Sequence, residues 1–219
     1  MTLPREVVAT GVVAELGDFE ELVRSLDPPD LAAPSRCEGW TAGDVAAHVI
    51  GQISDITAGR FDGLGTPEVT QRQVEERRGR TSAELADELA TARAATVDLL
   101  AVFDDAAWAG PSPAGDGTLG AGVESIWVDA YLHADDIRVA VGRPTEVGPG
   151  VQASIMHVGE LLTEQGHPPV TLALEGVDEY LVSGGGTRVT GDAMAFALVA
   201  TGRGDPAGFS LDERVNVYR

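Results

Sequence analysis

Hydrophobic residues recur every three or four positions through most of the first 145 residues, which is the period of an amphipathic helix. The first such stripe covers residues 5–26, and the Asp-Pro-Pro-Asp segment at 27–30 ends it because proline cannot continue a helix. A second helix is expected after Thr41, whose hydroxyl can cap it. Asp44, three residues on, completes a variant of the capping box.

Two further long helices follow. Thr81 and Glu84 form a second capping box that opens the third helix. Before it, the charged segment 71–80 predicts a short exposed helix, with its arginines either on a solvated face or forming a rim that attracts anions. Residues 104–122 are rich in Gly and Pro and predict a loop, after which the fourth long helix runs to about Val141.

The expected fold is mainly α, an antiparallel four-helix bundle over residues 1–145 followed by a small α+β domain over 146–219. Four helices joined by loops can bury their apolar stripes against one another and build a site in the shared core. In the C-terminal part we expect helices at 150–165 and 192–201, strands at 170–174, 180–182 and 187–190, and a closing strand at 215–218.

Composition narrows the class of protein. With 43% hydrophobic and 23% charged residues the chain is typical of a soluble globular protein. We find neither a signal peptide nor a membrane span in the sequence, and we expect a cytoplasmic protein. The net charge of −20 argues against a nucleic-acid partner, because neutralising phosphates requires clustered basic residues.

The chain contains no lysine, since all 15 basic residues are arginine. Lysine Schiff-base chemistry, pyridoxal phosphate attachment and a P-loop are therefore excluded. The single Cys37 cannot form an internal disulfide, and no histidine lies near it in the sequence to activate it as a nucleophile. Any metal site must use carboxylates and some of the four histidines, which are His48, His133, His157 and His167.

The fourth helix carries the candidate chemistry. Asp129, His133 and Asp136 are spaced by four and three residues, so at about 100° per residue they share one face. His133 belongs to the apolar stripe of this helix and Asp129 borders it. Buried ionisable groups need partners, and a metal ion is one such partner. Taken alone, Asp129 and His133 could also form only a salt bridge.

His48 supplies the third candidate ligand. It lies on the inward stripe of the second helix, with Gln52 one turn beyond it as a candidate contact for a bound cofactor. Two imidazoles and a carboxylate from two helices match a facial site for Zn²⁺ or Fe²⁺ that leaves positions open to substrate.

Asp136 has two possible roles. It could orient a ligating imidazole through a hydrogen bond, or it could form an ion pair with Arg138 or Arg143 near the helix end. We interpret His157 and His167 as structural, because they lie on no recognisable pattern.

Two segments resemble signatures of the mycothiol-dependent maleylpyruvate isomerase family, part of the wider DinB-like four-helix superfamily. The first runs from Cys37 through Gly-Trp-Thr and Asp-Val to His48, and the second from Asp129 through His133 to Asp136. The resemblance implies a DinB-like bundle that holds zinc through His48, Asp129 and His133. The sequence departs from the family's pattern at Asp129, where the family typically has Glu.

The resemblance also implies that an arginine of the C-terminal domain faces the site, and Arg203 is the best positional match. The implied enzyme uses mycothiol as a co-substrate and acts on a small electrophile, either as a cis–trans isomerase or as a thiol S-transferase. An actinobacterial source and a monomer or homodimer would be consistent with it. Two other functions stay open, a bundle that binds a small molecule or metal without turnover, and a zinc hydrolase that uses metal-bound water.

Overall fold

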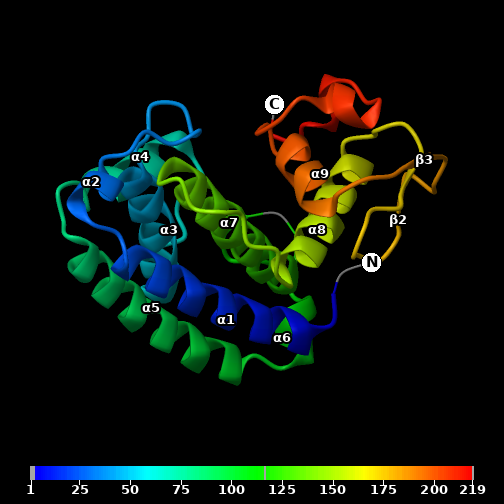
Figure 1. Ribbon diagram of the computed structural model, residues 1–219. Helices are drawn as coiled ribbons and strands as arrows, with labels where there is room; N and C mark the ends of the chain where they lie inside the picture. The colour runs from blue at the N-terminus through cyan, green and yellow to red at the C-terminus, as the bar shows by residue number, and fades with distance from the viewer. Residues whose placement is uncertain (1–2, 116, 219) are drawn as a thin grey trace. The chain divides into compact units, whose positions relative to one another are not determined.

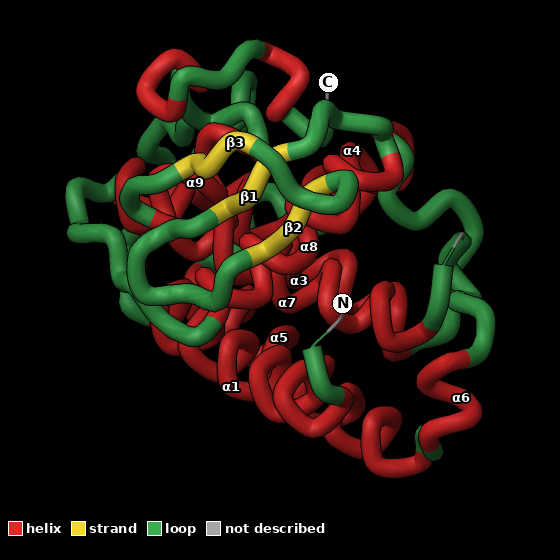
Figure 2. Tube along the Cα trace, turned by 90° about the vertical axis from the view of Figure 1, so that its right-hand side faces the viewer, coloured by secondary structure: helices red, strands yellow, loops and turns green. Residues whose placement is uncertain are grey.

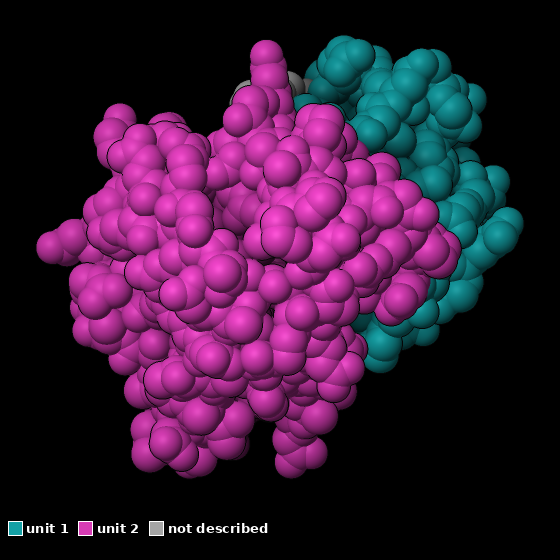
Figure 3. Space-filling view, turned by 60° about the vertical axis from the view of Figure 1, so that its left-hand side comes forward, with its two compact units in different colours: residues 1–4, 147–219 teal, residues 5–146 magenta. Residues whose placement is uncertain are grey.

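The computed structural model describes residues 3–115 and 117–218. The chain divides into two compact units, which Figure 3 colours separately. One unit comprises residues 5–146. The other comprises, among the described residues, Leu3, Pro4 and residues 147–218.

The unit of residues 5–146 is a four-helix bundle, as predicted. Its long helices are α1 (Arg5–Arg24), α3 (Ala42–Thr57), α5 (Ser82–Val102) and α7 (Leu119–Ala140). Helices α1 and α3 each pack against both α5 and α7, so the order around the bundle is α1, α5, α3, α7 (Figure 1). The second and fourth long helices, α3 and α7, are therefore direct neighbours.

Local chemistry explains where these helices begin. The predicted capping boxes form at both positions, with the Thr41 and Thr81 hydroxyls accepting from the backbone N–H of Asp44 and Glu84. Close approach of α1 and α7 depends on Gly11, because a Cβ there would lie 2.3 Å from the Trp127 ring. The fully buried side chains of α1 follow the predicted stripe and include Val8, Val12, Leu16, Phe19 and Val23.

The connecting segments contain more helix than the sequence predicted. The short helices are α2 (Pro28–Leu31), α4 (Pro67–Glu75) and α6 (Asp105–Ala109). The predicted loop at 104–122 is wrong at both ends, because Asp104 caps α6 and Thr118 already caps α7. Asp116, in the middle of that predicted loop, lies outside the described residues.

The helix predicted at 71–80 was expected to be exposed, and this expectation is also wrong. Helix α4 begins earlier, at Pro67, and it packs against α3. Gln73 and Val74 are fully buried, and Arg77 beyond the helix end is 5% exposed. A helix expected to be solvated therefore has a buried face.

The second unit combines two helices with a small sheet, and its elements are α8 (Gly150–Glu164), β1 (Val170–Leu172), β2 (Tyr180–Val182), β3 (Thr187–Val189), α9 (Ala193–Ala200), η1 (Pro206–Phe209) and η2 (Glu213–Val215). Strand β1 lies between the other two strands, antiparallel to β2 and parallel to β3 (Figure 2). Helix α8 packs against α9 and β2.

The predicted closing strand at 215–218 is absent. The side chain of Asp212 accepts from the backbone N–H of Arg214 and starts a 3₁₀ turn instead, which ends at Val215. Val217 N–H donates to the Ala200 carbonyl, so the segment is joined to the end of α9 rather than to the sheet. Its alternating valines are buried by this packing. Within the described part of the chain, no helix is both long enough and apolar enough to cross a membrane.

Candidate metal centre

Helices α3 and α7 bring together the three residues predicted as metal ligands. His48 Nε2 lies 3.5 Å from Asp129 Oδ2, and His133 Nε2 lies 3.4 Å from Asp129 Oδ1. The ligand atoms of all three residues are within 4.8 Å of one another. Both histidines are buried, whereas the Asp129 side chain keeps 30% of its surface exposed. The cluster is therefore accessible at the carboxylate.

The spacing of these atoms suits an ion between them better than direct hydrogen bonds. An N–H···O bond is typically about 2.9 Å long. Zinc–nitrogen and zinc–oxygen bonds of about 2.0–2.2 Å in a tetrahedral site separate neighbouring ligand atoms by about 3.3–3.5 Å. In addition, Asp129 Oδ2 is buried without a hydrogen-bond partner among the described residues. The donor set and the unpaired oxygen both fit a divalent cation such as zinc.

The electrostatics of the cluster favour an ionised carboxylate. Burial alone would raise the pKa of Asp129, but the charge of His133 and the polar contacts of both imidazoles with the carboxylate outweigh it and hold that pKa well below its usual range. Burial alone would lower the pKa of His133, but the Asp129 and Asp136 carboxylates raise it well above its usual value. A proton on His133 and a metal cation would thus compete for the same negative charge.

The far nitrogen of His133 is held by Asp136. His133 Nδ1 lies 2.8 Å from Asp136 Oδ2, and the Asp136 side chain is fully buried. Arg36 balances the buried carboxylate, with its Nε 2.5 Å from Asp136 Oδ1 and its Nη2 2.5 Å from Asp135 Oδ2. The structure places Asp136 behind His133 and pairs it with Arg36. Arg138 and Arg143, the alternative partners of Asp136, form ion pairs with Glu146 and Asp30.

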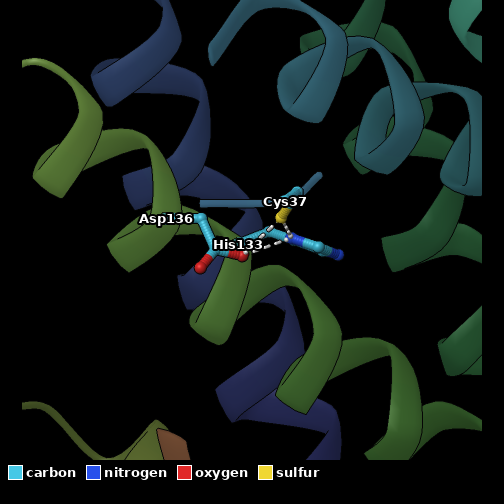
Figure 4. A group of neighbouring side chains, drawn as sticks. All are labelled: Cys37, His133 and Asp136. Carbon is cyan, nitrogen blue, oxygen red and sulfur yellow. Dashed lines mark hydrogen bonds and ion pairs between the residues drawn. The ribbon is translucent and has the colours of Figure 1, made fainter. Parts of the chain in front are cut away.

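Cys37 lies next to the same pair (Figure 4). Its Sγ is 3.3 Å from Asp136 Oδ2 and 4.0 Å from His133 Nδ1. The thiol therefore donates to a carboxylate that already accepts from His133 and Arg36. Although Cys37, His133 and Asp136 could offer three metal ligands, the Arg36 cation on Asp136 disfavours a second cation there.

A tight turn before α3 puts Cys37 and Arg36 against α7. Trp40 N–H donates to the Cys37 carbonyl, and Ser35 N–H donates back to the Trp40 carbonyl. Gly39 has φ of +80°, a conformation that other residues rarely adopt. The Trp40 ring ends up 5.4 Å from the His48 ring, so this loop forms one wall of the site. The proximity of Cys37 to a histidine 96 residues away could not be seen from local spacing.

Gln73 is a neighbour of the site that the sequence did not indicate. Its Oε1 lies 3.3 Å from His48 Nδ1, on the side of the ring away from Asp129. Its Nε2 donates to Asp55 Oδ2 at 2.8 Å. The one available signal was Gly51, where a Cβ would lie 2.6 Å from the Gln73 Cβ. A small residue on the α3 surface marks the close approach of another helix.

The family model described as the mycothiol maleylpyruvate isomerase N-terminal domain matches residues 12–138, which is more than half of the chain and includes the whole cluster. The chain belongs to this family. A comparison with curated proteins gave no match.

The family assignment agrees with the fold. A crystal structure of the mycothiol-dependent maleylpyruvate isomerase is similar at a TM-score of 0.69 and 17% sequence identity, covering 97% of this chain and 98% of that one. A histidine-to-alanine variant of that isomerase gives a TM-score of 0.67 at the same identity and coverage. The fold of both units in this family member is thus the maleylpyruvate isomerase fold.

The other candidate residues lie outside the cluster. Gln52 follows His48 by one turn on α3, and its Oε1 is buried without a hydrogen-bond partner among the described residues. Arg203 belongs to the other unit, just after α9, where its guanidinium donates to the Thr201 carbonyl. Its approach to the site stays a prediction. His157 and His167 also lie in that unit, outside the cluster.

Proposed function

We propose that this protein is a metal-dependent, thiol-using enzyme that isomerises a small cis-unsaturated acid with mycothiol as co-substrate. His48, Asp129 and His133 would hold the metal, and zinc suits this nitrogen and carboxylate set. The observation that carries the proposal is the placement of both imidazole Nε2 atoms 3.4–3.5 Å from one carboxylate, that of Asp129. Membership of the family supports the choice of thiol.

When bound, zinc would lower the pKa of a coordinated thiol so that the thiolate forms near neutral pH. The residues of the chain prepare this step. Asp136 accepts from His133 Nδ1 and so keeps the lone pair of Nε2 directed at the site. Asp129 stays ionised and supplies one negative charge against the cation.

The reaction that follows needs no net consumption of thiol. Addition of the thiolate to a conjugated cis double bond converts it to a single bond, rotation about that bond follows, and elimination returns the thiol and the trans product. Retention of the adduct would give a thiol S-transferase instead. A dianionic acid is repelled by a chain of net charge −20, so a cation near the site is needed, and we assign that role to Arg203.

Asp129 is one methylene shorter than the glutamate typical of the family. The two 3.4–3.5 Å distances indicate that the shorter side chain still reaches both imidazoles, because α3 and α7 are direct neighbours. Asp129 therefore serves as the third ligand in this proposal.

The proposal is tested by incubating the zinc-loaded protein with maleylpyruvate, with and without mycothiol, and analysing the products. We expect the trans isomer to form only when thiol is present, with the thiol recovered. Arg203→Ala should keep its zinc and lose most of this rate. Accumulation of a stable thiol adduct would identify a transferase. Turnover that ignores the thiol would contradict the proposal and favour a zinc hydrolase, and zinc binding without any turnover would favour a binding protein.

A further inference from the structure

A chain of buried polar groups runs from His48 away from the metal centre, and the proposed function does not yet use it. Gln73 is 1% exposed and Asp55 is fully buried, yet both are polar. Gln73 Oε1 lies 3.3 Å from His48 Nδ1, and Gln73 Nε2 lies 2.8 Å from Asp55 Oδ2. Burying an amide is costly unless both of its ends are hydrogen-bonded, and here both are.

The far end of this chain is a carboxylate that can only accept. Asp55 receives Arg60 Nε at 2.8 Å on one oxygen and Arg72 Nη2 at 2.6 Å on the other. Burial alone would raise the pKa of Asp55, but hydrogen bonds from Gln73, Arg72 and Arg60 outweigh it and lower that pKa. Asp55 therefore stays ionised and offers no hydrogen to Gln73.

The direction of these hydrogen bonds determines the orientation of the Gln73 amide and the position of a hydrogen on the His48 ring. Because Asp55 only accepts, the amide nitrogen of Gln73 must face it and the amide oxygen must face His48. That oxygen also only accepts, so the His48 nitrogen opposite it, Nδ1, must carry a hydrogen. A neutral ring with its hydrogen on Nδ1 has its lone pair on Nε2, the nitrogen that faces Asp129.

Close packing of α3 against α4 brings Gln73 within reach of His48. At Gly51, one turn after His48, a Cβ would lie 2.6 Å from Gln73 Cβ and 2.8 Å from Gln73 Cγ. Any larger residue would push the helices apart. The contact between His48 and Gln73 thus depends on a glycine in the interior of a helix, where glycine is less favourable than alanine.

We propose that Gln73, anchored by Asp55, is a positioning residue that fixes the hydrogen of His48 on Nδ1 and so presents Nε2 to the metal. The inference rests on the proposed function, because presenting Nε2 matters only if a metal binds there. The directions of the hydrogen bonds themselves do not depend on a metal. Gln73 acts on one imidazole as Asp136 acts on the other, from α4 rather than from within α7. Both rings are then oriented before the cation arrives.

The first test compares Gln73→Met with Gln71→Met, the same change at an exposed position of α4. Zinc affinity is measured by competition with a chromogenic chelator, and folding by circular dichroism and Tm. We expect Gln73→Met to weaken zinc binding about 10–100-fold, as the loss of a group that orients a ligand does, and Gln71→Met to leave it within twofold. A folded Gln73→Met protein that binds zinc like the wild type would overturn the proposal.

The second test measures directly which nitrogen of the His48 ring carries hydrogen, in the metal-free wild-type protein. Long-range ¹H–¹⁵N correlation spectra of ¹⁵N-histidine-labelled protein, with His48 assigned by its loss in His48→Ala, report which ring nitrogen carries hydrogen. The proposal requires hydrogen on Nδ1. A neutral His48 ring with hydrogen on Nε2 and none on Nδ1 would overturn it, even if Gln73→Met fails to fold. If the wild type binds no zinc, the proposed function fails, and the ring measurement still decides this inference.

Discussion

Glu15 is a buried carboxyl group whose ionisation should reduce the stability of the bundle. It lies on the buried face of α1, 9% exposed. Burial, followed by the charge of Asp18, raises its pKa to about 7 from an ordinary value of 4.5, even though a hydrogen bond with Trp127 acts in the opposite direction. The folded protein therefore holds this proton more tightly than the unfolded chain does.

The sign of the effect follows from linkage. A carboxyl group with a raised pKa destabilises the folded state above that pKa, and the penalty disappears as the pH falls below the unfolded pKa. With pKa values of about 7 and 4.5, the difference of about 2.5 pKa units corresponds to about 3 kcal/mol at pH 8. By the same relation less than about 1 kcal/mol remains at pH 5.

Glu15→Gln removes this penalty while keeping an oxygen that can accept from Trp127. We expect the variant to be more stable than the wild type at pH 8 by up to about 3 kcal/mol, or roughly 6–12 °C in Tm for a chain of this length. The gain should shrink to about a quarter at pH 5. Thermal unfolding followed by circular dichroism at the two pH values measures both.

Glu21→Gln serves as the matched control, because Glu21 is exposed on the same helix. It should change Tm little at either pH. A Glu15→Gln variant that is less stable than the wild type at pH 8, or equally stabilised at pH 5 and pH 8, would contradict this prediction. Either result would mean that the Glu15 carboxylate is stabilised inside the bundle rather than penalised.

Two further predictions concern the surroundings of the metal centre. Asp136→Asn should weaken zinc binding about 10–100-fold by competition titration, because it removes the charge that orients His133 and leaves the Arg36 cation facing a neutral amide. Unchanged affinity in a folded variant would show that Asp136 serves only the Arg36 pair. Gly51→Ala should destabilise the protein by about 1 kcal/mol in urea unfolding, because the overlap of its Cβ with Gln73 costs about 1–3 kcal/mol and alanine recovers only about 1 kcal/mol in helix propensity. Wild-type stability would mean that α4 moves away without cost.

The four long helices and the three proposed ligands were predictable because their signals are local. Thr41 with Asp44 marks the start of α3 within four residues, and the spacing of Asp129 and His133 places both on one face of α7. The helical period then directs His48 inward. Only the neighbour relation of α3 and α7 had to be supplied by the fold.

The supporting groups were not predictable because their partners are distant in the chain and polar. Gln73 lies among charged residues of α4, and periodicity alone assigns such a segment to the surface. Arg36 and Cys37 contact Asp136 in space but precede it by about one hundred positions in the sequence. The prediction of a closing strand is wrong for a local reason. The turn that starts at Asp212 overrides the alternating pattern of Val215 and Val217.

His48, Asp129 and His133 together are proposed to bind one divalent metal ion. The most direct measurement is the zinc content of protein purified without chelator, determined by elemental analysis alongside the chain concentration. His48→Ala is compared with His157→Ala, a histidine outside the cluster. We predict one zinc per chain for the wild type and for His157→Ala, and close to none for His48→Ala. A wild type with far less than one zinc after zinc is supplied, or a His48→Ala variant that keeps it, would contradict the account.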